Sequence, residues 1–462
     1  MLFTSITFLF YFLPLLLLGY FLVHKNIKVS NAVLLAGSLV FYAWGEPVFV
    51  LIMLLSIVMN YSIGLLIDRY RNTGSYILMA GVFLNLSVLC YFKYLSFILS
   101  SIATFFSLSI NIPDVALPLG ISFFTFQAIT YLVDLNKKEI KVQRNMFDLA
   151  LYISLFPQLI AGPIVRYADI ETQIHNRTHS WLGFSDGIRR FLIGFGKKVL
   201  IANTFAQVAD EIFALPESEL TTYIVLIGVL AYTLQIYFDF SAYSDMAIGL
   251  AKMFGFDLKE NFNYPYISRS IKEFWRRWHI SLSTFLRDYL YIPLGGNRDG
   301  IFATYRNLLI VFFLCGLWHG AGWTFIIWGL YFGFFLVLER LFLEIYLVKI
   351  PKALSWIYMA IVVMFGWLIF RSDNLEQLFM MLNGMVNFEV TQLLYKYLQD
   401  RFLIVTFVLA LLGSTPLIRD YFINTSKPIV MIARDIFLMA TFIISIAFLA
   451  AGTYNPFIYF RF

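Results

Sequence analysis

The chain has 462 residues, of which 60% are hydrophobic and 13% are charged, and its mean hydropathy is +0.77. This composition excludes a soluble globular protein and indicates a polytopic membrane protein. The formal charge of +6 is modest. Because the basic residues flank apolar segments and form no separate domain, nucleic-acid binding is not expected. Both cysteines, Cys90 and Cys315, lie in apolar runs, so we expect buried thiols rather than disulfides or a metal site.

Apolar runs of membrane-spanning length follow one another along the whole chain. A span needs about 20 residues, which allows about ten to twelve passages here. The first run has no basic residue before it and no cleavage site, so we expect a transmembrane helix rather than a cleaved signal. The candidate spans lie near residues 1–23, 31–44, 47–67, 75–95, 117–134, 187–206, 220–252, 303–317, 320–346, 354–371, 400–418 and 431–452.

Three apolar segments are interrupted by proline or glycine. Residues 96–114 contain Pro113, and we expect them to lie at the membrane interface. Residues 148–165 and 280–296 each contain several prolines or glycines. Such breaks are tolerated at membrane depth where protein or a water-filled cavity covers the backbone. Both segments are therefore predicted to be re-entrant and to line a cavity.

The segments between the spans differ in charge. The distribution of lysine and arginine among them predicts how the chain is oriented in the membrane. Basic stretches occupy 25–28, 68–71, 137–144, 166–198 and 252–277, whereas 210–219 is acidic and holds no basic residue. Basic loops face the cytoplasm, which places the N-terminus outside. No internal repeat and no soluble domain is visible, so a single membrane domain over residues 1–462 is expected.

His319 lies deep in an apolar stretch, between glycines and tryptophans in Leu317-Trp-His-Gly-Ala-Gly-Trp323. An intramembrane ionisable residue is a candidate functional residue by default, and glycine beside it leaves room for a substrate. The alternative is a histidine that joins two helices by a hydrogen bond. His24, His175 and His179 lie in loops and have no unusual context.

A second cluster interleaves basic and aromatic residues between residues 268 and 288. Trp275, Arg276, Arg277 and Trp278 precede a second notable histidine, His279. Guanidinium groups bind phosphates and stack on aromatic rings, so the cluster suits a nucleotide-containing ligand such as coenzyme A. A basic belt that contacts anionic membrane lipid is equally compatible with these charges.

A third segment, Gln235 to Asp245, carries polar groups on two faces of a predicted helix. It is therefore expected to be surrounded by protein or water rather than lipid. Hydrogen bonding between helices explains its aspartates as well as catalysis does. No nucleophile elbow, zinc-spaced Cys/His cluster or His-Glu-x-x-His sequence is present, so no metal is expected.

A lone buried base suits direct acyl transfer from a thioester to a hydroxyl, because the thioester is already activated. A transporter or flippase of a lipid-linked glycan also combines many spans with broken helices. The absence of a repeated half weighs against that second interpretation.

At this point the chain resembles the membrane-bound O-acyltransferase family, in its bacterial polysaccharide-acetylating branch. The resemblance spans nearly the whole chain. It is carried by residues 118–127, 156–163, 237–245, 274–279, 291–297, 317–320 and 455–460.

The resemblance implies an all-α ring of about 11 transmembrane helices, with re-entrant segments around a central tunnel. His319 matches the position taken as catalytic and His279 the second signature histidine. The donor would be cytoplasmic acetyl-CoA, near Trp275, Arg276, Arg277 and Trp278. The acceptor would be an extracytoplasmic polysaccharide, reached through an SGNH-hydrolase-like partner, in a bacterial cytoplasmic membrane. His279 would polarise the thioester carbonyl or position the donor. Transfer of D-alanine to a wall polymer is the related alternative.

Overall fold

A computed structural model of the chain describes residues 1–160, 162–422, 427–452 and 454–456. Within these ranges all regular structure is helical. Eight helices of the described ranges are long and apolar enough to cross a membrane, and shorter apolar helices cover 8–23 and 401–413. The predicted all-α polytopic fold is therefore confirmed.

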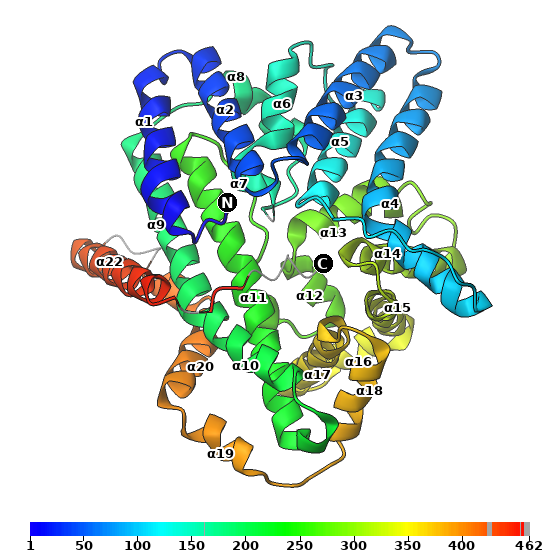
Figure 1. Ribbon diagram of the computed structural model, residues 1–462, viewed down its shortest axis with the longest axis vertical. Coiled ribbons are helices and arrows are strands. Elements are labelled where there is room, and N and C mark those ends of the chain that lie inside the picture. Colours follow the sequence, from blue (N-terminus) through cyan, green and yellow to red (C-terminus); the bar gives the residue numbers. More distant parts are fainter. Residues whose placement is uncertain (161, 423–426, 453, 457–462) are drawn as a thin grey trace. The chain divides into compact units, whose positions relative to one another are not determined.

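The chain divides into two compact units. Unit 1 comprises Met1–Phe191 and Met246–Lys259, and unit 2 comprises Leu192–Asp245 and Glu260–Phe462. The prediction of one domain over the whole chain stays a prediction. Unit 1 contains the helices α1 (Leu13–Val23), α2 (Ile27–Gly45), α3 (Val50–Arg69), α4 (Gly74–Phe106), α5 (Ile121–Asn136), α6 (Met146–Ser154), α7 (Phe156–Leu159) and α8 (Tyr167–His175) (Figure 1). Helix α9 (Trp181–Gly196) begins in unit 1 and continues into unit 2.

Unit 2 contains the C-terminal half of the fold. A π-helical turn, η2 (Lys197–Ala202), links α9 to the helices that follow. These are α10 (Asn203–Phe213), α11 (Thr222–Met253, which ends in unit 1), α12 (Ile271–Arg277), α13 (Ile280–Leu286), α14 (Ile301–His319), α15 (Trp323–Leu338), α16 (Glu344–Lys349), α17 (Lys352–Arg371), α18 (Leu375–Gly384), α19 (Gln392–Gln399), α20 (Arg401–Gly413), α21 (Leu417–Phe422) and α22 (Pro428–Ala450).

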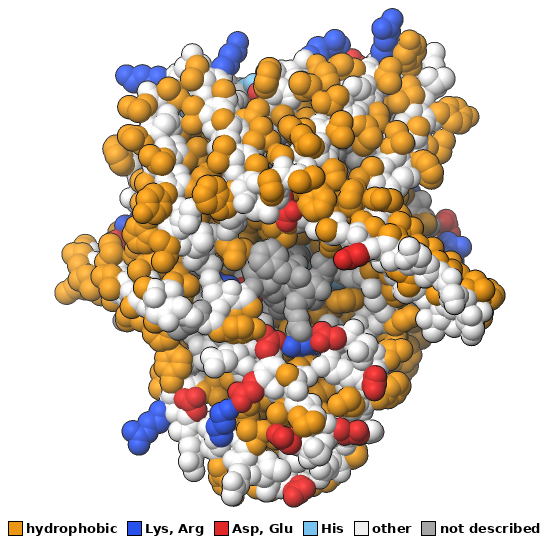
Figure 2. Space-filling model, viewed as in Figure 1, with side chains coloured by type: hydrophobic (Ala, Val, Ile, Leu, Met, Phe, Trp, Pro, Cys, Tyr) orange, Lys and Arg blue, Asp and Glu red, His pale blue; other side chains and the backbone are white. Residues whose placement is uncertain are grey.

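The basic turns of unit 1 gather at one end of its helices. Lysines and arginines follow α1, α3 and α5 (Figure 2). The guanidinium of Arg144 donates to Asp68 at 2.9 Å, which ties the segment after α5 to the end of α3. Between these turns and the other end, the outer surface of the unit is mostly hydrophobic (Figure 2). A hydrophobic flank with charges confined to the helix ends is what a bilayer requires.

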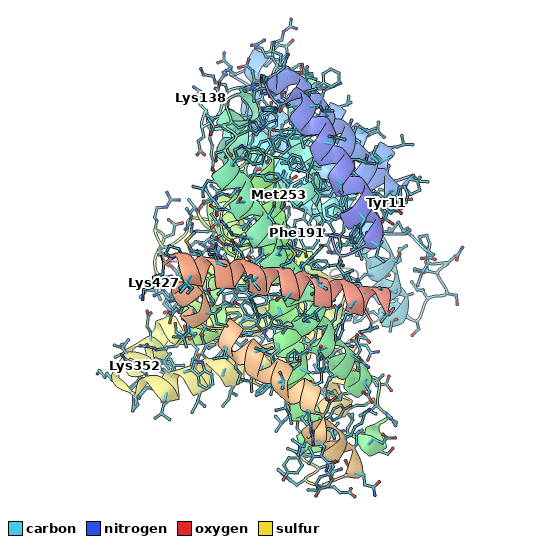
Figure 3. All side chains as sticks on the ribbon, turned by 90° about the vertical axis from the view of Figure 1, so that its left-hand side faces the viewer. Tyr11, Lys138, Phe191, Met253, Lys352 and Lys427 are labelled. Carbon is cyan, nitrogen blue, oxygen red and sulfur yellow. The ribbon has the colours of Figure 1, made fainter. Side chains whose placement is uncertain are left out.

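Helices differ sharply in how much of their apolar surface the protein covers. In α11, 83% of the most apolar window is buried, whereas in α22, the helix that begins after Lys427, only 11% is buried (Figure 3). The prediction that both cysteines are buried was wrong for Cys90, which is exposed on α4. Its helix buries only 17% of its apolar window, so Cys90 lies on a helix that the described residues leave largely uncovered.

The three interrupted segments fold in different ways. Helix α4 continues beyond residue 96 to Phe106 and ends at Ser107, whose φ of 53° is left-handed. Residues 148–165 form the buried helices α6 and α7, although Ala161 lies outside the described residues. Residues 280–296 form α13, a π-helical turn and a tight turn in which Gly295 and Gly296 have positive φ.

Candidate active site

His319 is the last residue of α14, at the point where the chain breaks before α15. The following glycines, Gly320 and Gly322, are fully extended, with φ of −161° and −165°. The imidazole is buried and meets the rings of Trp328 and Phe370 edge-on, at 5.0 and 5.2 Å between centroids. The helix break therefore places the histidine inside an aromatic pocket of unit 2.

Close packing of α14 against α15 fixes the position of that break. A Cβ added at Gly316 would lie 2.2 Å from the carbonyl oxygen of Phe325, and one at Gly329 would lie 2.2 Å from that of Phe312. Small residues let membrane helices approach this closely. His319, three residues after Gly316, thus has little freedom to shift along its helix.

His279 lies between α12 and α13, and it is completely buried. Its backbone is left-handed, with a φ of 43°, which is uncommon for a residue with a side chain. Its ring lies 6.2 Å from that of Trp318, whose own ring lies 4.8 Å from that of His319. The structure therefore brings both predicted histidines to one tryptophan.

Asn261 holds the turn that carries His279. Its side-chain oxygen lies 3.1 Å from His279 Nδ1, accepts the Ser281 backbone N–H at 3.1 Å and accepts the Ser281 hydroxyl at 2.9 Å. Its amide nitrogen donates to Ser244 Oγ on α11 at 3.2 Å. Asn261 was not among the predicted site residues, because nothing in the local sequence links it to a histidine 18 positions away.

Burial lowers the pKa of His279 to about 3, with desolvation as the cause. A neutral imidazole is therefore expected at any pH above that value, and a neutral ring has one nitrogen that donates and one that accepts.

The two tryptophans of the basic-aromatic cluster are buried in the core of unit 2. Trp275 contacts the rings of Phe312 and Trp328, at 5.1 and 5.7 Å between centroids. Trp278 packs on Trp367 at 4.8 Å. In these positions the two tryptophans help to hold in place the aromatic residues that surround His319.

Arginines of the same cluster face outward. Arg277 donates to Glu273 at 3.0 Å, and Arg276 is exposed. Arg276 has no ion pair or hydrogen bond within the described ranges. Of the four residues predicted to bind a nucleotide-containing ligand, this arginine alone presents a charge that no described side chain neutralises.

A buried carboxylate, Glu339, anchors α12. Its two oxygens accept the backbone N–H groups of Ile271 and Lys272, at 2.6 and 3.0 Å. Ser270 caps the same helix by accepting from the Glu273 N–H at 3.0 Å. These bonds satisfy N–H groups that a helix start leaves without partners. Glu339 was not among the predicted site residues, although a carboxylate within an apolar run is a signal of a functional residue.

The polar segment of α11 is enclosed by protein, as its two polar faces predicted. Asp239 pairs with Lys198 at 2.9 Å, with exposed fractions of 1% and 3%, and Asp245 pairs with Lys197 at 2.7 Å. Both lysines lie in the π-helical turn η2, a feature frequent near functional sites. Residues 187–206 were predicted as a plain span, and their two adjacent lysines were the overlooked signal.

Among the described residues, no group of three or more His, Cys, Asp or Glu side chains could hold a metal ion. The C-terminal stretch 455–460 lies outside the described residues from 457 onward. Lys198 also donates to the carbonyl of Pro456, and the amide of Asn203 donates to Asn455 at 3.1 Å. The described start of that stretch is thus held by η2 and α10.

The sequence profile of the membrane-bound O-acyltransferase family matches residues 39–382. The chain belongs to that family. It is therefore an O-acyltransferase, and the resemblance drawn from its motifs is confirmed. The matched range includes His279 and His319.

Relatives of this O-acyltransferase are similar over most of their length. A protein named probable alginate O-acetylase from Azotobacter vinelandii is 47% identical over 84% of this chain and 78% of its own. One of the same name from Pseudomonas putida is 42% identical over 100% of both chains. A peptidoglycan O-acetyltransferase from Helicobacter pylori is 38% identical over 84% of this chain and 80% of its own.

Proposed function

We propose that this O-acyltransferase moves an acetyl group from cytoplasmic acetyl-CoA to hydroxyls of an extracytoplasmic polysaccharide. The single observation that carries the proposal is the pair of buried histidines, His279 and His319, which meet at Trp318 in an aromatic pocket. Relatives named for O-acetylation of alginate and of peptidoglycan support the acetyl group and the polymer class.

In the proposed reaction His319 acts as the general base. Its imidazole takes the proton of an acceptor hydroxyl while the oxygen attacks the thioester carbonyl. The C–S bond of the tetrahedral intermediate then breaks, and the leaving thiolate takes the proton from the imidazolium. The products are an O-acetyl ester and free coenzyme A. Fixing the base at a helix break contributes through orientation, because α14 and α15 leave it little freedom.

The donor is proposed to approach from the cytoplasm, near the end of α12. Arg276 is exposed and would contact phosphate groups, with Arg277 beside it. Trp275 and Trp278 would act indirectly, by holding this helix against α15 and α17. The basic turns of unit 1 are proposed to face the cytoplasm, which places the N-terminus outside and the protein in a bacterial cytoplasmic membrane.

The acceptor side is proposed to involve a separate SGNH-hydrolase-like protein that receives the acetyl group or delivers the polymer. Reconstitution with and without such a partner separates the two routes. Acetylated polymer formed by the membrane protein alone would count against an obligatory partner.

The decisive experiment compares wild type with His319→Ala in nanodiscs supplied with acetyl-CoA and candidate acceptors. We expect the substitution to lower thiol release and labelled acetyl transfer by at least about 100-fold, as for loss of a positioned base. His175→Ala, at the exposed histidine that ends α8, is the matched control and is expected to keep wild-type activity. Near-wild-type transfer by folded His319→Ala would contradict the assignment of His319 as the general base. A D-alanyl donor that is used in place of acetyl-CoA would instead favour modification of a wall polymer with D-alanine.

A further inference from the structure

The direction of the hydrogen bonds around Asn261 decides which nitrogen of His279 carries a proton. A backbone N–H can only donate, so the bond from the Ser281 N–H identifies the atom it reaches as the oxygen of the Asn261 amide. The bond from the amide nitrogen to Ser244 Oγ agrees with that orientation. His279 Nδ1 lies 3.1 Å from this oxygen. The Ser281 hydroxyl lies 3.4 Å from Nδ1 but donates over the shorter distance of 2.9 Å to the same Asn261 oxygen. An unprotonated Nδ1 would face that oxygen with a lone pair, so we assign the proton to Nδ1.

The other nitrogen of the ring, Nε2, then carries a lone pair. It is buried and has no hydrogen-bond partner within the described ranges of the chain. Aromatic rings surround the imidazole, with Phe240 at 4.6 Å and Trp318 at 6.2 Å between centroids. Burying an acceptor without a partner is unfavourable, and a ligand that donates to Nε2 would remove that cost.

The backbone geometry of the turn depends on the same asparagine. The Ile280 N–H donates to the Asn261 carbonyl at 2.9 Å, and the Asn263 N–H donates to the Arg277 carbonyl at 2.9 Å. These two bonds pair residues 261–263 with the ends of α12 and α13. They hold His279 in its left-handed conformation, so ring orientation and tautomer are set together.

We propose that Asn261 is a positioning residue that locks His279 in the Nδ1–H tautomer, so that His279 meets the substrate as a hydrogen-bond acceptor at Nε2. The proposal rests on the acyl transfer proposed above and assigns His279 a different part in it. A neutral ring that offers a lone pair cannot donate to a thioester carbonyl, so polarisation of that carbonyl is excluded for this tautomer. The bound group is an O–H or N–H: the acceptor hydroxyl or an amide of the pantetheine arm of the donor.

Tautomer and activity are measured separately in the test. Nitrogen-15 spectra of histidine-labelled protein in nanodiscs report which ring nitrogen is protonated. We expect an Nδ1–H signal from His279 that disappears in His279→Gln and that changes to Nε2–H in Asn261→Ala. His24, whose Nδ1 lies 2.6 Å from the Phe21 carbonyl oxygen, should give a second Nδ1–H signal that both variants keep. An Nε2–H signal for His279 in the wild type would overturn the proposal.

Kinetics test whether Asn261 acts through His279. Asn261→Ala is expected to lower kcat by about 10- to 100-fold and to cause no further loss in a His279→Ala background, because coupled residues are not additive. Additive losses would show an independent role and would overturn the proposal. Asn263→Ala removes only an exposed side chain two residues away and keeps the backbone bond to Arg277, so this matched control is expected to keep wild-type rates.

Asn261→Asp provides a second variant that keeps the acceptor oxygen. A carboxylate beside Nδ1 favours the charged imidazolium and raises the pKa of His279. Activity should therefore fall at a higher pH than in the wild type on the acid side of the profile. An unchanged profile, in a variant that keeps activity, would contradict the proposal.

The KM values of the His279→Ala variant also identify the group that binds Nε2. A raised KM for acetyl-CoA in His279→Ala assigns the pantetheine amide, and a raised KM for the polymer assigns its hydroxyl. Finding the Nδ1–H tautomer without acetyl transfer from any donor would leave the positioning role standing and remove the proposed function instead.

Discussion

At the scale of single residues, the buried pair of Lys198 and Asp239 is sensitive to substitution. Breaking a buried ion pair by removing one partner costs about 3–5 kcal/mol, because the remaining charge stays buried and loses that partner. Lys198→Met should therefore lower thermal stability strongly, whereas Lys198→Met combined with Asp239→Leu should recover much of the loss. Thermal unfolding in detergent measures both. Lys197→Met, whose lysine is 22% exposed, is the control with the smaller expected effect, and equal losses at both lysines would contradict this account.

At the scale of secondary-structure elements, the contact between α14 and α15 positions the proposed base. Gly316→Ala would place a methyl group against a backbone carbonyl that cannot move without moving α15. We expect a loss of about 1–3 kcal/mol and a lower kcat, because His319 follows three residues later. Gly333→Ala is the control on the same pair of helices, since its added Cβ meets side-chain atoms of Phe312 and Leu309 at 3.2 and 3.3 Å. Unchanged activity in Gly316→Ala would show that the histidine tolerates displacement.

At the scale of the whole molecule, the buried neutral His279 makes stability depend on pH. Its pKa is about 3 in the folded protein and about 6.5 in an unfolded chain. Between these values the unfolded state binds more protons, so stability falls as pH falls below about 6.5, by up to about 1.4 kcal/mol for each pH unit. Thermal unfolding between pH 7 and 5 should show this slope, and His279→Gln should flatten it. His175→Gln, the control at the exposed histidine that ends α8, should leave the slope as in the wild type.

Features that depend on residues close together in the sequence could be predicted, whereas features that depend on contacts between distant residues could not. The eight long apolar helices were predictable, because apolar runs are local signals, whereas the spans expected at 117–134 and 187–206 are not among them. The two histidines were singled out as ionisable residues by a similarly local signal, and their role stays a prediction. The aromatic pocket was not, since Trp275 and Trp278 could equally have faced a ligand and only the packing of α12 against α15 and α17 buries them. The role of Asn261 could not be predicted either, because its partners His279 and Ser281 come next to it only through the turn that follows helix α12.

The contrast between α22, with 11% of its apolar window buried, and α11, with 83% buried, has a consequence for variation. Most side chains of α22 are not covered by the described residues, and in a bilayer they would face hydrocarbon chains, which impose no fixed packing. Any apolar residue of helical propensity should serve there, and a library of substitutions should return Leu, Ile, Val and Phe almost interchangeably. Along α11 the neighbours are fixed side chains and buried charges, so the same library should return few survivors.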